Sequence, residues 1–163
     1  MRRIIAILLE NEAGALSRVV GLFAQRNYNI ESLSVAPTED ETLSRLTVVT
    51  FGDASRSEQI IKQLYKLVEV VEVMDLCESD HVERELLLMK VKAVGEVREE
   101  IKRTTDVFRG QIVDVSSGTY TVQLVGPGAK LDAFLRAIGK ANIIEVGRSG
   151  VLGMSRGDRI LSV

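Results

Sequence analysis

Cysteine and histidine are scarce in this sequence of 163 residues. There is one cysteine, Cys77, and one histidine, His81. A single cysteine excludes a disulfide within the chain, so a reducing, cytoplasmic setting is the simplest expectation. No Cys-x-x-Cys or His-x-x-x-His spacing occurs, and the sequence therefore provides no ligand set for a structural zinc or copper ion.

Long apolar runs and blocks of one charge are also missing. Charges interrupt every apolar stretch well short of the about 20 residues that a membrane-spanning helix needs. The run Ile4–Leu9 behind Arg2 and Arg3 is too short for a secretory signal. The 21 lysines and arginines are interspersed with 23 aspartates and glutamates, which gives a formal net charge of −2. Without a basic surface field, we expect neither a nucleic-acid partner nor a membrane partner.

Groups that could perform catalysis are not assembled anywhere in the sequence. His81 lies in a polar stretch beside Asp80, which favours an exposed linker histidine over a general base. Cys77 follows a predicted strand and has no helix start nearby to activate it, so we predict a buried or edge thiol. The segment Gly126–Lys130 resembles part of a phosphate loop but lacks the required glycine and lysine spacing, and a turn into a helix explains it. We therefore predict no catalytic residue, metal or cofactor in this chain.

The spacing of apolar residues in the first half of the chain predicts alternating strands and helices. Runs of β-branched residues or a period of two predict strands, and stripes at i, i+3, i+4 and i+7 predict helices. The predicted elements are a strand at Ile4–Leu9, a helix from Leu16 to about Asn27, strands at Ile30–Val35 and Leu43–Phe51, a helix from about Ser57 to Val68, and a strand at Val70–Leu76. This βαββαβ order is that of a ferredoxin-like sandwich, with both helices on one face of an antiparallel sheet. The other face would need a cover.

The same order of elements restarts after a polar stretch at 78–82, which is predicted to be a linker. The second set comprises a strand at Leu86–Val91, a helix at Val97–Phe108, strands at Gln111–Val115 and Thr119–Val125, a helix at Leu131–Ile138, and a strand at Ile143–Val146. The tail 147–163 contains glycines and little periodicity, so no element is assigned to it. We therefore predict an α+β fold with two ferredoxin-like βαββαβ units, at 1–77 and 83–163.

The loop that follows the first predicted strand is the sharpest local feature. Its small residues, including Gly14, let backbone amides at a helix N-terminus approach a carboxylate, as in a site for a free amino acid. Asn11 offers a donor and an acceptor, and Asn29 opens the second strand, near the end of the first strand or across an interface. A structural interpretation is also open. In that case Asn11 caps the helix, Gly14 only permits a turn, and Asn29 ends a helix in left-handed geometry.

Several long stretches resemble one protein family, the small regulatory subunits of acetohydroxyacid synthase (acetolactate synthase). They are RRIIAILLENEAGALSRVVGLFAQRNYNIESLSVAPTEDETLSRLTVV, HVERELLLMKV, FRGQIVDVSSGTYTVQL, KLDAFL and EVGRSGVLGMSRGD. The resemblance implies an N-terminal ACT domain, a related C-terminal domain, and a homodimer whose paired ACT domains bind valine at their interface. It assigns valine binding to Asn11, Gly14, Ala15, Leu16, Asn29 and Ile30. The family commonly has glycine where this chain has Asn27, a residue type that also tolerates positive φ.

The resemblance also implies a partner, the catalytic large subunit, which would contain thiamine diphosphate, magnesium and FAD. This chain would then not be an enzyme by itself. It would activate the large subunit and make it subject to feedback inhibition by valine in branched-chain amino-acid biosynthesis. Two other interpretations are weaker: a free-standing ACT-type amino-acid sensor, and an acylphosphatase-like hydrolase on the same fold. An RNA-binding module is disfavoured, because the strand Leu43–Phe51 would offer only Phe51 for base stacking.

Overall fold

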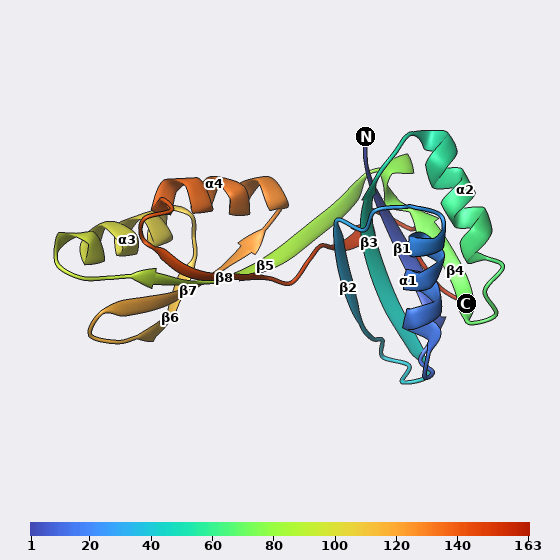
Figure 1. Ribbon diagram of the computed structural model, residues 1–163, viewed down its shortest axis with the longest axis horizontal. Coiled ribbons are helices and arrows are strands. Elements are labelled where there is room, and N and C mark those ends of the chain that lie inside the picture. The colour runs from blue at the N-terminus through green and yellow to red at the C-terminus, as the bar shows by residue number, and fades with distance from the viewer. The chain divides into compact units, whose positions relative to one another are not determined.

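The computed structural model describes residues 1–163, which divide into two compact units (Figure 1). Unit 1 contains Met1–Val82 together with Val151–Val163, and unit 2 contains Glu83–Gly150. Each unit has a hydrophobic core of its own between one sheet and two helices. No helix of the structure has the length and apolar character needed to cross a membrane.

Unit 1 consists of an antiparallel sheet with two helices on one face (Figure 1). Its elements are β1 (Arg2–Glu10), α1 (Ala15–Gln25), β2 (Ser32–Pro37), β3 (Leu43–Phe51), α2 (Ala54–Leu64), β4 (Val70–Asp75) and the short 3₁₀ helix η1 (Leu76–Glu78). The strand order is β2-β3-β1-β4, so β1 and β3 are central and β2 and β4 are edge strands. The predicted βαββαβ order is confirmed. Helix α2 begins earlier than predicted because the Asp53 carboxylate caps it, accepting from the Arg56 backbone N–H at 2.8 Å.

Strand β1 is buried on both faces. Ile5, Ile7 and Leu9 alternate toward the helices, where they pack with α1 residues such as Phe23. Ile4 and Ala6 point to the opposite face, and both are fully buried there as well. Full burial of an aliphatic or aromatic side chain of this size contributes about 1.5–3 kcal/mol, so β1 is the most strongly held strand of unit 1.

The C-terminal segment Val151–Val163 covers the second face of this sheet. Val151 and Leu161 pack in the cluster that contains Ile4, Val49 and Leu76. Within the segment, the strand β9 comprises Leu152–Ser155, and the Arg45 guanidinium donates to the Gly153 carbonyl oxygen at 2.7 Å. The sequence predicted no element to cover this face of the sheet. The structure shows that part of the tail 147–163, to which no element was assigned, covers it.

Two predicted boundaries differ from the structure. The second domain was predicted to occupy 83–163, but the structure groups Val151–Val163 with unit 1, because its few apolar residues pack on the first sheet. The predicted linker 78–82 is not a free loop, since β5 (His81–Lys92) begins within it and continues without interruption. His81 is consequently half-buried at the start of a strand rather than exposed.

Unit 2 repeats the topology of unit 1. After β5 come α3 (Glu96–Val107), β6 (Gln111–Val115), β7 (Thr119–Gly126), α4 (Gly128–Ile138) and β8 (Ile143–Arg148), and the strand order is β6-β7-β5-β8. Residues 87, 89, 91 and 93 of this part of the chain are buried and alternate with exposed residues. Arg148 binds Glu85 through two hydrogen bonds of 2.8 and 2.9 Å and Asp132 through one of 2.7 Å. These carboxylates raise the pKa of Arg148 and tie α4 to the sheet.

Gly153→Ala should destabilise unit 1, because a Cβ atom at this position would lie 2.5 Å from the Leu76 Cδ1 atom. Overpacking of this kind costs about 1–3 kcal/mol, which urea unfolding followed by circular dichroism would measure. Gly147→Ala is the matched control, because nothing lies within 4 Å of its added Cβ atom. Its free energy of unfolding should stay within about 0.5 kcal/mol of wild type. Equal stabilities of the two variants would contradict the close contact.

Asn27→Ala should also lower the free energy of unfolding, because Asn27 has a φ of 55° directly after α1. A left-handed residue with a Cβ atom costs about 1–2 kcal/mol, and asparagine offsets part of this cost through local hydrogen bonds. Asn27→Gly, which removes the Cβ atom, should change the stability by less than the alanine variant does. The same unfolding assay measures both, and an alanine variant as stable as the glycine variant would refute the conformational argument.

Candidate functional site

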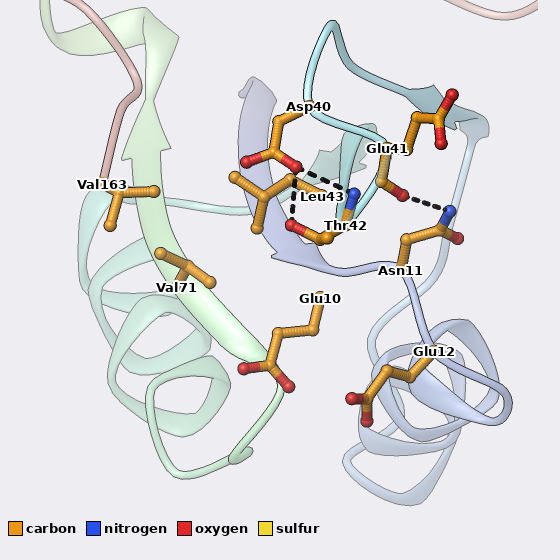
Figure 2. A pocket seen from close by; sticks show the side chains of 9 residues that line it. All are labelled: Glu10, Asn11, Glu12, Asp40, Glu41, Thr42, Leu43, Val71 and Val163. Carbon is orange, nitrogen blue, oxygen red and sulfur yellow. Dashed lines mark hydrogen bonds between the residues drawn. The ribbon is translucent and has the colours of Figure 1, made fainter.

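The loop after β1 is held by the turn between β2 and β3. The Asn11 backbone N–H donates to the Thr42 carbonyl oxygen at 2.7 Å. Its side-chain amide donates to the Glu41 carbonyl oxygen at 2.9 Å, as the dashed line in Figure 2 shows. Asp40 fixes the turn itself by accepting from the Thr42 hydroxyl and backbone N–H groups (Figure 2). Asn11 is therefore an exposed side chain on a well-supported loop.

Gly14, rather than Asn11, stands at the N-cap of α1. Gly14 has a φ of 86° in the left-handed region, and no side chain caps the helix. The interpretation in which Asn11 caps α1 is thus wrong. An α-helix leaves its first N–H groups without intrahelical acceptors, and the first turn of α1 contains no acidic residue. These groups and the positive end of the helix dipole suit a carboxylate.

A cavity of about 250 Å³ adjoins this helix start. It brings together three of the predicted site residues, Asn11, Ala15 and Leu16, while Gly14 lies in the same loop. The remaining lining residues are Leu9, Glu10, Glu12, Val35, Ala36, Pro37 and Ser44. Polar groups therefore border the loop, whereas the end of β2 provides an apolar wall. Sequence analysis missed this wall because β2 appeared there only as a strand closed by proline.

A second cavity, of about 710 Å³, adjoins the same loop (Figure 2). Glu10, Asn11 and Glu12 line both cavities. The second one is bordered in addition by the turn at 40–43, Val71 and Val163. The loop that carries Asn11 thus borders both this acidic cavity and the smaller, more apolar cavity beside α1.

Asn29 and Ile30 lie at the opposite end of the sheet from Asn11. Asn29 accepts a hydrogen bond of 2.6 Å from the Thr50 hydroxyl, whereas Asn11 lies beside the start of β3. The six residue-to-residue steps of β3 from Ser44 to Thr50 span about 20 Å at about 3.3 Å per residue. A single chain therefore does not bring Asn29 to the cavity that Asn11 lines, and the interpretation that joins them within one chain is wrong.

The other predicted features occupy ordinary structural positions. Cys77 lies in η1, not in a strand, and is half-buried, and burial raises the pKa of its thiol. Gly126 ends β7 and Pro127 caps α4, which confirms a turn into a helix in place of a phosphate loop. No group of three or more His, Cys, Asp or Glu side chains is arranged to hold a metal ion.

The sequence matches two family models that together cover most of the chain. An AHAS small subunit-like ACT domain matches residues 5–72, and the model described as the small subunit of acetolactate synthase matches residues 84–157. The acetolactate synthase isozyme 3 small subunit of Escherichia coli K12 is 61% identical over 162 residues, which cover 99% of each chain. The chain belongs to the acetolactate synthase small-subunit family.

More distant members of the family support the same assignment. The probable acetolactate synthase small subunit of Archaeoglobus fulgidus is 45% identical over 98% of this chain and 99% of its own. The crystal structure of the acetolactate synthase small subunit from Thermotoga maritima has a TM-score of 0.90 at 37% identity, covering 98% of this chain and 99% of that one.

Family membership assigns an ACT regulatory domain to unit 1 and confirms the resemblance seen in the sequence. The second family model extends to residue 157, past the end of unit 2 at Gly150. The sequence module and the compact unit therefore end at different residues. The residues that bind an effector do not follow from membership and stay a prediction.

The ion pair between Arg18 and Glu69 lies next to the candidate site and depends on pH. The Glu69 backbone carbonyl accepts from the Glu10 N–H at 2.8 Å, and its carboxylate pairs with Arg18, whose guanidinium lies beside Gly14. The hydrogen bond from Arg18 lowers the pKa of Glu69 below its ordinary value. The ionised carboxylate therefore stabilises the folded state above the unfolded pKa, and this contribution is lost as the pH falls through the folded pKa.

Glu69→Gln should consequently lower the free energy of unfolding at pH 7, and its effect should shrink as the pH falls through the lowered pKa of the folded wild-type carboxyl group, for example at pH 3. Urea unfolding at the two pH values measures the difference. Glu39→Gln, in the exposed turn between β2 and β3, serves as the control and should change stability little at either pH. A loss for Glu69→Gln that is equally large at pH 3 would rule out the ion pair as its cause.

Proposed function

We propose that this chain is the regulatory subunit that activates the catalytic large subunit of acetolactate synthase and makes it sensitive to valine. The main support is the 61% identity over 99% of both chains with a protein named as an acetolactate synthase small subunit. A small subunit implies a large one. Thiamine diphosphate, magnesium and FAD would belong to that partner, and this chain would supply no catalytic group.

The proposed valine site is shared by two copies of the chain. Strand β2 is an edge strand whose exposed end includes Val35, 40% exposed, and Pro37. Antiparallel pairing of two β2 strands about a two-fold axis would bring the start of one strand beside the end of the other. Asn29 of one protomer would then approach the cavity beside Asn11 of its partner. Such pairing would bring together two asparagines that lie at opposite ends of the sheet within one chain.

The chemistry of the shared site suits a small apolar amino acid. The amides in the first turn of α1, beside Gly14, would bind the carboxylate. The Ala15 N–H itself already donates to the Glu12 carbonyl oxygen at 3.2 Å, so Ala15 would contribute to the wall of the site. Asn11 and Asn29 would provide polar contacts from the two protomers, including an acceptor for the ammonium group. Leu16 and Ile30 would border the isopropyl group. The apolar end of β2 extends this surface.

Regulation requires that valine bind more tightly to the inhibited arrangement of the complex than to the active one. A ligand with equal affinity for both arrangements would shift nothing. A pocket formed by two protomers can provide such a difference, because the ligand contacts both sides and changes how the two ACT domains pair. The coupling would then pass from the dimer interface to the large subunit.

The decisive assay measures acetolactate formation by the cognate large subunit with and without this chain, followed by a valine titration. Activation and inhibition by valine are the expected results. Activation without valine sensitivity would retain the partner and reject the proposed effector site. No effect on a cognate large subunit would reject the regulatory role and favour a free-standing amino-acid sensor.

Asn29→His should raise the valine concentration needed for half-inhibition by at least about tenfold, equivalent to about 1.4 kcal/mol. A larger side chain would crowd the ligand, whereas basal activation should stay near wild type because Asn29 is exposed and outside the core. Lys66→His, on an exposed residue after α2, is the control and should leave inhibition unchanged. Loss of activation together with inhibition would indicate misfolding and would not support the site.

A further inference from the structure

We propose that Thr50 and Arg56 are positioning residues for the half of the effector site that contains Asn29. The inference rests on the proposed function, in which Asn29 contacts valine. It concerns two residues that lie behind Asn29 and are not among the predicted ligand-binding residues. Their role would be to fix the backbone on which the exposed Asn29 side chain is carried.

The segment that contains Asn29 has no regular secondary structure. It connects the end of α1 at Gln25 with the start of β2 at Ser32. Its backbone turns at Asn27, where φ is 55°. The Tyr28 N–H donates to the Phe23 carbonyl oxygen at 2.8 Å. A connection of this kind needs contacts from outside the segment to keep one conformation, since helix and strand hydrogen bonds do not determine it.

Thr50 provides the first of these contacts. It is 1% exposed, and its hydroxyl donates to the Asn29 carbonyl oxygen at 2.6 Å. The adjacent backbone contact, from the Glu31 N–H to the Val49 carbonyl oxygen at 2.8 Å, fixes the strand that follows. Loss of the Thr50 hydroxyl would leave the Asn29 carbonyl without this donor. The backbone at Asn29 would then be less restricted in direction.

Arg56 provides the second contact, from α2. Its guanidinium donates to the Asn27 carbonyl oxygen at 2.8 Å and lies 4.9 Å from the centre of the Tyr28 ring. One arginine thus contacts two successive residues before Asn29 through a hydrogen bond and a cation–π interaction. Lysine cannot reproduce this planar, two-part contact.

Gly52 gives Arg56 the room to reach this position. A Cβ atom at residue 52 would lie 2.8 Å from the Arg56 Cδ atom. The Arg56 backbone is fixed as well, since its N–H donates to the Asp53 carboxylate at the start of α2. The end of β3 and the first turn of α2 therefore form a support whose contacts converge on Asn27, Tyr28 and Asn29.

The test compares Thr50→Val with Thr50→Ser in the full chain. Valine removes the hydroxyl at nearly constant volume, and serine retains it. Valine binding is measured by calorimetry, and valine inhibition is measured in the complex with the cognate large subunit. We expect Thr50→Val to weaken valine affinity about tenfold and Thr50→Ser to stay within about twofold, in line with the loss of one buried hydrogen bond.

Arg56→Met supplies an independent variant, since it retains the apolar stem and removes the guanidinium. It should weaken valine affinity several-fold, with maximal activation unchanged. Arg26→Met is its matched control, because Arg26 donates to the Gln63 side chain at 2.8 Å and not to a carbonyl oxygen of this segment. Arg26→Met should leave valine affinity unchanged.

The readouts separate positioning from a merely structural role. A merely structural role would lower the melting temperature without changing the valine affinity of the folded protein, and that outcome would overturn the proposal. Equal losses of affinity for Thr50→Val and Thr50→Ser would also overturn it, because the hydroxyl would not be the cause. Failure of the proposed function is distinguishable, since the wild-type chain itself would then show no valine binding.

Discussion

Strand β1 is enclosed from two sides, and the candidate site depends on this enclosure. Its residues Ile5 and Ile7 pack against the helices, and its residues Ile4 and Ala6 pack against the cluster that includes Val151. Because β1 is fixed in this way, the loop that follows it begins from a rigid strand. The hydrogen bonds of that loop to the turn at 40–43 continue the support up to the start of α1, which no side chain caps.

The same sheet separates the two halves of the site. Asn11 follows the end of central strand β1, whereas Asn29 precedes edge strand β2 and lies beside the other end of β3. An edge strand can pair with another copy of itself, and two-fold symmetry would reverse its direction. Dimerisation and effector binding would then use the same surface. A small molecule bound there could change how the two protomers pair, which gives a physical basis for regulation.

The element order and the Asn11 loop could be predicted from the sequence because strand and helix periods are strong local signals. The role of the tail could not, because Val151 and Leu161 are isolated apolar residues whose partners lie far away in the sequence. The distance between Asn11 and Asn29 depends on strand order, which local patterns do not contain. The hydrogen bonds from Thr50 and Arg56 could not be predicted either, because each is a tertiary contact to a backbone carbonyl oxygen.

The most direct test of the shared site mixes two variants expected to bind valine weakly, Asn11→Ala and Asn29→His, and allows their subunits to exchange. A mixed dimer would contain one site with both substitutions and one site with neither. Valine binding measured by calorimetry should therefore return at about a quarter of the sites, with wild-type affinity, if exchange is random. The absence of any recovery in dimers shown to be mixed would contradict a site built from two protomers.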